Sequence, residues 1–204
     1  VIGQSIGILQ SMRIQQAAGL NGNRYATFHQ LGKEQAQKLH EDDRLYDVGD
    51  TIFIGSTPLG NSSLSLYLRE YHDNALSMYP AIGNVKEGRL PEEAIEIALS
   101  EDALQYLGLD AVIGDTVSLD LSVSVMDGSL SELEYSADFV LTGILESSYI
   151  GYASGTVEGI VGEGTAEELL PEEYLLYSTD FKTYDKQNFQ SIIYALAEDL
   201  NVDE

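Results

Sequence analysis

The stretch from Asn84 to Leu119 reads NVKEGRLPEEAIEIALSEDALQYLGLDAVIGDTVSL and holds the most ordered series of local signals in the chain. It opens with a Gly-Arg-Leu-Pro turn at Gly88–Pro91. An apolar run at Ala94–Leu99 follows and indicates a short buried strand. The Ser-Glu-Asp step at Ser100 is typical of a helix start, because a serine hydroxyl satisfies free N–H groups there.

The second half of this stretch predicts a helix, a turn and a strand. The helix ends at Gly108, since glycine tolerates the left-handed conformation that commonly closes a helix. Gly114 and Asp115 form a turn, and the alternating residues Thr116–Leu119 begin a strand. The pattern is structural, and none of its residues has the surroundings of a catalyst.

These motifs resemble a known family. EGRLPEE (87–93), EIALSEDALQYLGL (96–109) and IGDTVSL (113–119), followed by FVLTGIL (139–145), resemble the large extracytoplasmic domain of ABC-transporter permeases of the macrolide-export and FtsX-like type, the MacB periplasmic core domain. The shared pattern is Gly-x-x-Pro, an acidic step, a strand ending in Ser, a helix ending in Leu-Gly, and Gly-Asp-x-Val-x-Leu. The likeness is weak in the first 75 residues and loose over 146–172.

The resemblance implies an α+β fold with two parts. Residues 1–77 and 173–204 would form a porter-like layered sheet-and-helix subdomain from two chain halves, and residues 78–172 a smaller inserted β-rich subdomain. The segment Val1–Gln10 is then the outer end of a membrane helix, although its pattern alone favours an ordinary amphipathic helix.

The rest of the chain offers simpler patterns. Asn21-Gly22 predicts a β-hairpin, because both turn positions accept positive φ. The Gly-rich segment 147–164 predicts a long loop or a mobile lobe. Other expected elements are helices at 33–40, 165–170 (capped by Thr165) and 185–200, a short helix or turn at 72–79, and strands at 45–54, 64–71, 120–125, 133–145 and 174–178.

Composition limits the classes of partner. The chain of 204 residues carries 34 acidic and 10 basic residues, a formal charge of −24, which disfavours nucleic acid and favours cationic partners. It has no cysteine and no apolar run long enough to span a membrane. The acidity also suits a domain that must stay soluble outside the cytoplasm.

Tests for chemistry give no catalytic, cofactor or metal residue. The three histidines, His29, His40 and His72, include no HExxH pair, and His72-Asp73 beside Glu70 is interpreted as a polar turn. Gly-rich 159–164 lacks the GxGxxG order that binds a dinucleotide. Acidic pairs at 92–93, 167–168 and 172–173 are expected by chance in so acidic a chain.

Tyr149 and Tyr152 are the candidate partner-contact residues, because they lie in the Gly-rich segment where a partner would be met. The resemblance implies a non-enzymatic permease domain outside the cell membrane. Its partners would be a cytoplasmic ATPase subunit or domain, a second permease copy, and an adaptor protein or a peptide or small-molecule substrate, with no nucleic acid and no cofactor. The alternatives are a free-standing secreted binding module and a carboxylate-dependent hydrolase.

Overall fold

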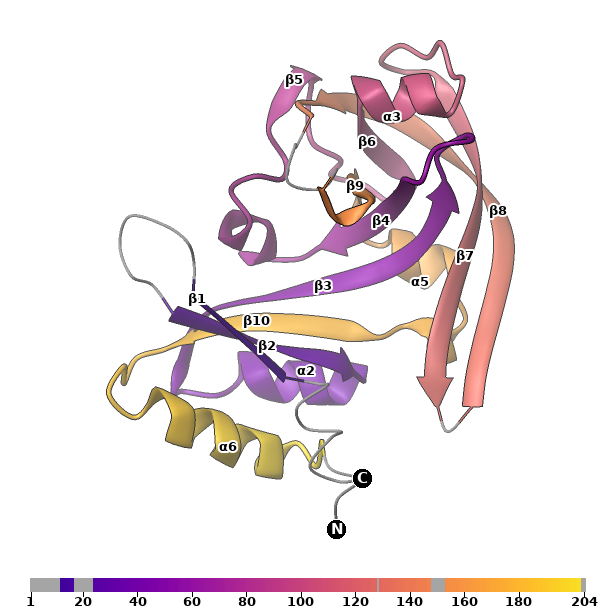
Figure 1. Cartoon of the computed structure of the whole chain (residues 1–204). Helices are drawn as coiled ribbons and strands as arrows, with labels where there is room; N and C mark the ends of the chain where they lie inside the picture. The colour runs from indigo at the N-terminus through magenta and orange to yellow at the C-terminus, as the bar shows by residue number, and fades with distance from the viewer. Residues whose placement is uncertain (1–11, 17–23, 128, 148–152, 203–204) are drawn as a thin grey trace. The chain divides into compact units, whose positions relative to one another are not determined.

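The computed structural model describes residues 12–16, 24–127, 129–147 and 153–202, and its helices and strands confirm the predicted α+β class (Figure 1). The predicted helix at Val1–Gln10 lies outside these residues. None of the helices within them has both the length and the apolar character needed to cross a bilayer.

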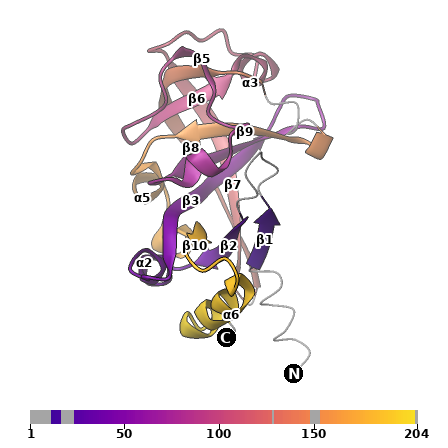
Figure 2. The same cartoon turned by 90° about the vertical axis from the view of Figure 1, so that its left-hand side faces the viewer.

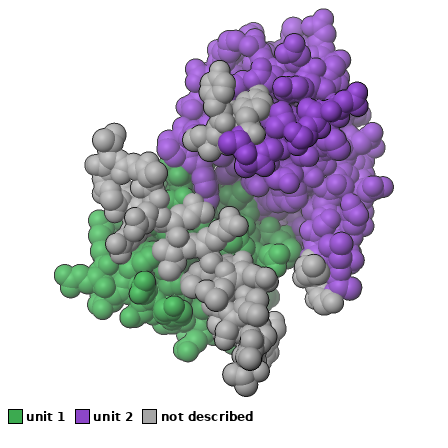
Figure 3. Space-filling view, viewed as in Figure 1, with its two compact units in different colours: residues 1–51, 72–78, 176–204 green, residues 52–71, 79–175 purple. Residues whose placement is uncertain are grey.

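The chain forms two compact units, coloured separately in Figure 3. Unit 1 comprises residues 1–51, 72–78 and 176–204, and unit 2 comprises residues 52–71 and 79–175. This grouping differs from the predicted boundaries at residues 52–71, which belong to unit 2. Residues 65–70 of this segment pair there with a strand at residues 156–161. The division into domains therefore stays a proposal.

Unit 1 is a small sheet with two helices. Its strands are β1 (Met12–Gln16), β2 (Arg24–Leu31), β10 (Tyr177–Thr183) and the first part of β3 (Leu45–Pro58), in the order β1-β2-β10-β3. The antiparallel pairing of β1 with β2 confirms the hairpin predicted at Asn21-Gly22, whose turn lies outside the described residues. The other elements are α2 (Lys33–His40), η1 (Ala75–Met78) and α6 (Phe189–Asp199).

The core of unit 1 lies between its sheet and its helices. Phe28 of β2 and Phe181 of β10 are fully buried, and their rings stack with centroids 5.6 Å apart. Helix α6 contributes one apolar side, because residues three and four apart share a helix face. That side consists of Phe189, Ile193, Leu196 and Ala197.

Unit 2 contains most of the strands. They are the remainder of β3, β4 (Ser65–Tyr71), β5 (Val85–Gly88), β6 (Glu96–Ser100), β7 (Thr116–Asp127), β8 (Ser129–Leu145) and β9 (Thr156–Val161). The order is β3-β4-β9-β6-β8-β5, and β7 pairs with β8 and, at Ser56↔Ser122, with β3. The short helices α3 (Glu101–Tyr106), α5 (Thr165–Leu169) and η2 (Glu172–Tyr174) complete it.

The stretch Asn84–Leu119 contains the predicted helix cap, helix end and turn. The Ser100 side chain accepts a hydrogen bond from the Ala103 backbone N–H at 3.2 Å and caps α3. Gly108 follows the end of α3 with φ of +70°, and Gly114 turns the chain before β7 with φ of +96°. Such values favour glycine, which has no Cβ to clash.

A carboxylate fixes the turn between β5 and β6. Glu96 accepts hydrogen bonds from the backbone N–H groups of Glu92 and Glu93, at 2.8 and 3.1 Å, and pairs with the Arg89 guanidinium. The Arg89 hydrogen bond in particular lowers the pKa of Glu96 to about 2, although burial opposes the shift. Glu92 and Glu93 thus take part in the turn through their backbone N–H groups, and their side chains are exposed.

This lowered pKa makes part of the stability of unit 2 pH-dependent. Because the pKa is lower in the folded state, the contribution is present above the ordinary value near 4.5 and is lost as pH falls toward 2. We expect Glu96→Gln to be less stable than the wild type at pH 7, and the deficit to fall by roughly half or more at pH 3. Thermal unfolding of both proteins at the two pH values checks this, and an unchanged deficit would contradict it.

The Gly-rich segment is not the long loop that its composition predicts. Residues Thr156–Val161 form β9, which pairs in parallel with β4 from Ser65↔Thr156 to Glu70↔Val161. Gly159 is needed there, because a Cβ would lie 2.6 Å from a Leu68 methyl and 2.8 Å from a Leu99 methyl. The glycine therefore marks close packing within a strand.

Other boundaries also differ from prediction. Gly164, with φ of +94°, precedes α5 at the N-cap, and Thr165 instead donates its hydroxyl to the Gly162 carbonyl at 2.6 Å. The strand expected at 174–178 begins only at Tyr177. Helix α6 begins at Phe189, because Asp185 accepts hydrogen bonds from the Gln187 and Asn188 N–H groups and holds a turn ahead of the helix.

Candidate functional site at the C-terminal helix

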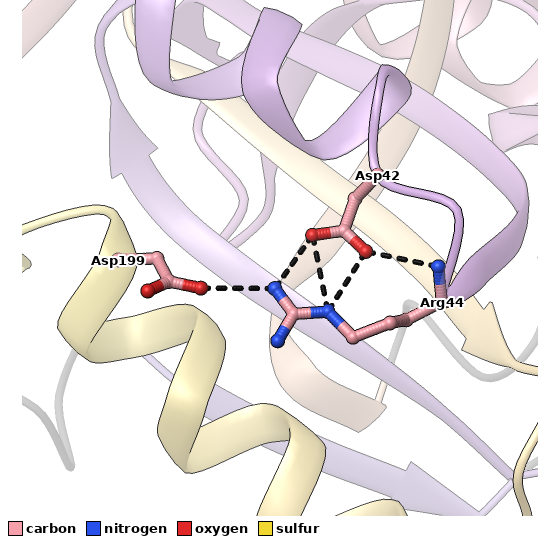
Figure 4. Close-up of polar contacts among 3 residues, drawn as sticks. All are labelled: Asp42, Arg44 and Asp199. Atoms are coloured by element: carbon pink, nitrogen blue, oxygen red, sulfur yellow. Dashed lines mark hydrogen bonds and ion pairs between the residues drawn. The ribbon is translucent and has the colours of Figure 1, made fainter.

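Helix α6 is attached to the rest of unit 1 by a set of polar contacts at its C-terminal end (Figure 4). We call this set the α6 clamp. It brings together α6, α2 and the loop between α2 and β3, and Figure 2 shows α6 beside α2. Its residues are Gln35, Asp42, Arg44, Asp199 and Leu200.

Asp42 holds the side chain of Arg44 in the position from which it contacts α6. The Asp42 carboxylate accepts from the Arg44 backbone N–H at 2.9 Å, from Nε at 2.9 Å and from Nη2 at 2.7 Å. Because Asp42 precedes Arg44 by two residues, its carboxylate can bind both the backbone N–H and the guanidinium group of Arg44. The hydrogen bonds from Arg44 lower the pKa of Asp42, although burial opposes the shift.

The same guanidinium then binds α6. Arg44 Nη2 lies 2.9 Å from Asp199 Oδ2, in the last turn of the helix. An acidic residue near a helix C-terminus is unfavourable to the helix dipole, and the positive charge of Arg44 offsets this. Hydrogen bonds to Asp42 and Asp199 raise the pKa of Arg44, so it stays charged.

Gln35 provides a second attachment. Its Nε2 donates to the carbonyl of Leu200, the C-cap of α6, at 2.8 Å. Its Oε1 accepts from the Gly32 N–H at the start of α2, at 2.9 Å. One side chain therefore satisfies backbone groups at the end of one helix and the start of another.

Arg44→Ala is expected to loosen α6 while unit 1 stays folded. Removal of this partly exposed, doubly bonded guanidinium should cost about 1 kcal/mol of local stability. Amide hydrogen exchange in α6 should accelerate by roughly fivefold, and exchange in β2 and β10 should change little. Lys186→Ala removes an equal charge from the exposed loop before α6 and serves as the control. Equal exchange in the two variants would contradict the role of the clamp.

A second polar cluster in unit 1 resembles a catalytic triad only in composition. His40 Nε2 lies 2.9 Å from Asp50 Oδ2, and the Thr179 hydroxyl donates to Asp50 Oδ1 at 2.5 Å. A nucleophile requires the histidine between hydroxyl and carboxylate, whereas here the carboxylate lies in the middle. Thr179 therefore has no base, and the cluster satisfies buried polar groups.

The structure separates the residues of the predicted polar turn around His72. The Asp73 carboxylate lies 4.0 Å from His40 Nδ1 and is exposed. Glu70, only 1% exposed, instead accepts hydrogen bonds from the backbone N–H groups of Gly164 at 2.8 Å and Ala166 at 2.6 Å. Sequence reasoning missed this role of Glu70. The signal was its place after Leu66 and Leu68 on the buried face of one strand.

The structure does not describe the two tyrosines that the sequence predicts as partner contacts. Tyr149 and Tyr152 lie outside the described residues, so their role as partner contacts stays a prediction. Within the residues that the structure describes, no group of three or more His, Asp or Glu side chains could hold a metal ion.

Comparison with known proteins identifies the fold. No protein-family model and no curated protein sequence matches this chain. A crystal structure of the periplasmic region of MacB from Actinobacillus actinomycetemcomitans is similar to it, with a TM-score of 0.54 and 16% sequence identity. The match covers 96% of this chain and 85% of that one. The chain therefore has a MacB-like periplasmic domain fold, as its sequence motifs indicated.

Proposed function

We propose that this chain is an extracytoplasmic domain of an ABC-transporter permease of the macrolide-export or FtsX-like type. The observation that supports this most strongly is the likeness to the MacB periplasmic region over nearly the whole chain. The sequence motifs of 84–119, whose turn, strand and capped helix the structure contains, support the same class. The domain would face the outside of a cell membrane.

Its role would be mechanical and non-enzymatic. ATP binding and hydrolysis by a cytoplasmic ATPase subunit or domain would move the membrane helices of a permease dimer. The first and last described elements, β1 and α6, both belong to unit 1, so motion arriving from both sides would enter the same unit. The α6 clamp is then the rigid joint that passes displacement of α6 to α2 and β3.

The units would in turn act on an adaptor protein or on a peptide or small-molecule substrate. A chain that forms two compact units is suited to bind a partner differently in two conformational states. The acidic surface favours binding of a cationic ligand or partner. Tyr149 and Tyr152 stay candidate contacts for such a partner.

Cysteine labelling tests the proposed location, because this chain has no native cysteine. Ser131→Cys places a thiol at an exposed position of β8. In intact cells that express the full-length protein, a membrane-impermeant maleimide should label this thiol. The same reaction in permeabilised cells gives the maximum signal. Labelling only after permeabilisation would contradict the proposal, and release of labelled chain into the medium would favour a secreted module.

A further inference from the structure

Strands β7 and β8 of unit 2 form a long two-stranded ribbon (Figure 1). One face of this ribbon is polar and exposed. Across the two strands, four consecutive rows on this face each pair one serine with one carboxylate, and the opposite face buries Val117, Leu119, Leu121 and Val123. We call the polar face the acidic ribbon face. Its rows are Ser118↔Asp138, Asp120↔Ser136, Ser122↔Glu134 and Ser124↔Glu132.

Two of the serines hold the two aspartates of this face in place. The Ser118 hydroxyl donates to Asp138 and the Ser136 hydroxyl donates to Asp120, each at 2.5 Å. Because each serine separates carboxylates that would otherwise lie opposite each other, direct like-charge pairs across the strands are avoided. The result is a row of fixed negative charges on a rigid scaffold.

A hollow of about 550 Å³ opens beside this face, where the end of β3 meets the ribbon. The Tyr135 hydroxyl closes one side by donating to the Ile54 carbonyl at 2.5 Å. Carboxylates of Asp120 and Glu134 lie at the rim. The residues that line it are Ser56, Thr57, Pro58, Asp120, Leu121, Ser122, Glu134, Tyr135 and Ser136.

Thr57 contributes a polar side chain to the lining of the hollow. Gly55, two residues earlier, faces the ribbon, since a Cβ there would lie 3.1 Å from Leu121 Cβ and 3.2 Å from the Ser122 carbonyl. Residues two apart on a strand share a face, so Thr57 faces the same way. It is only 9% exposed, and its hydroxyl has no hydrogen-bond partner among the described residues. A hydroxyl that is not engaged in the protein can donate a hydrogen bond to a ligand group or accept one from it.

The charge of unit 2 identifies the kind of ligand. Unit 2 has 21 acidic and three basic residues, a net charge of −18 out of −24 for the chain. All three basic residues pair with carboxylates that lie away from the acidic ribbon face. The pairs are Arg69–Glu158, Lys86–Glu101 and Arg89–Glu96.

We propose that the acidic ribbon face and its hollow bind a basic polypeptide segment. A lysine or arginine side chain would enter the hollow near Asp120 and Glu134, and its polar groups or backbone would meet the Thr57 hydroxyl. Further basic residues would follow Glu132 and Asp138 along the ribbon, where side chains alternate as they do on an extended peptide. A bound metal ion is disfavoured, because the described carboxylates form no group with metal-ligand convergence. This inference does not depend on the transporter assignment.

Fluorescence anisotropy with fluorescein-labelled octalysine tests the proposal on the 204-residue chain. We expect Asp120→Asn/Glu134→Gln to raise the Kd about tenfold, since two partly exposed charge pairs are lost. Glu92→Gln/Glu93→Gln removes the same charge from another exposed part of unit 2 and should change the Kd less than about twofold. Thr57→Val, which keeps the shape and removes the hydroxyl, should raise the Kd about threefold.

The variants distinguish binding at a local site from attraction by the net charge of unit 2. Equal weakening by the two double variants would overturn the site, because the charge of the whole unit would then explain binding. Absence of octalysine binding to the wild type at 50 mM salt would also overturn it. If Thr57→Val binds octalysine with the same Kd as the wild type, the hollow is not part of the binding site. None of these three results bears on the location of the domain, which the cysteine labelling measures separately.

Discussion

Replacing Gly162 with alanine is expected to destabilise unit 2 by about 3 kcal/mol, one of the two largest effects of a single substitution that we predict. An added Cβ would lie 1.8 Å from the Glu93 carbonyl oxygen and 2.7 Å from its carbon. Both atoms are backbone, so no side chain can rotate away. Gly162 also donates its N–H to the Glu96 carbonyl at 3.0 Å, which fixes the two segments against each other.

Gly108→Ala is the matched control for this change. Gly108 has φ of +70°, but nothing lies within 4 Å of the Cβ that alanine would add. Its cost should be limited to backbone strain, about 1 kcal/mol. Denaturant unfolding measures both variants, and hydrogen exchange in β6 and β9 reports unit 2 separately from unit 1. A Gly162→Ala protein as stable as Gly108→Ala would contradict the predicted clash.

Glu70→Ala is expected to have a comparable effect, also about 3 kcal/mol. The substitution removes a buried carboxylate and leaves the N–H groups of Gly164 and Ala166 without their acceptor. Glu70→Gln keeps the size and one good acceptor, so its cost should fall between alanine and wild type. Hydrogen exchange should accelerate first in α5, where the freed N–H groups lie.

Glu168→Ala serves as the control for Glu70→Ala, because it removes an exposed acid from α5 itself. It should change the free energy of unfolding by less than about 0.5 kcal/mol. Both are measured by guanidinium unfolding at pH 7. If Glu70→Ala unfolds like Glu168→Ala, the carboxylate of Glu70 does not hold the start of α5, and the structural account of that contact is wrong.

The parts of the fold that local signals specify were predictable from the sequence. The cap at Ser100 and the helix end at Gly108 depend on residues within a few positions of each other, so the pattern contains the whole cause. The same holds for the hairpin of β1 and β2. Their agreement with the structure reflects short-range chemistry.

The parts that depend on distant partners were not predictable. Thr156–Val161 is a strand because β4, about 90 residues earlier in the chain, offers a pairing edge, and Gly159 is there to make room for Leu68 and Leu99. The α6 clamp likewise joins Arg44 to Asp199 across 155 positions. No local pattern marks either residue as half of a pair.

The central claim is that ATP-driven motion outside this chain changes the arrangement of its two units. Spin labels at Tyr194→Cys on α6 and Leu130→Cys on β8, both exposed positions, would report one unit each. Distances between the labels can be measured in the full-length protein together with its proposed ATPase, after removal of any other cysteines. We expect the distance distribution to differ between the nucleotide-free and the ATP-trapped complex. An identical distribution in a complex that still hydrolyses ATP would contradict the proposed mechanical role.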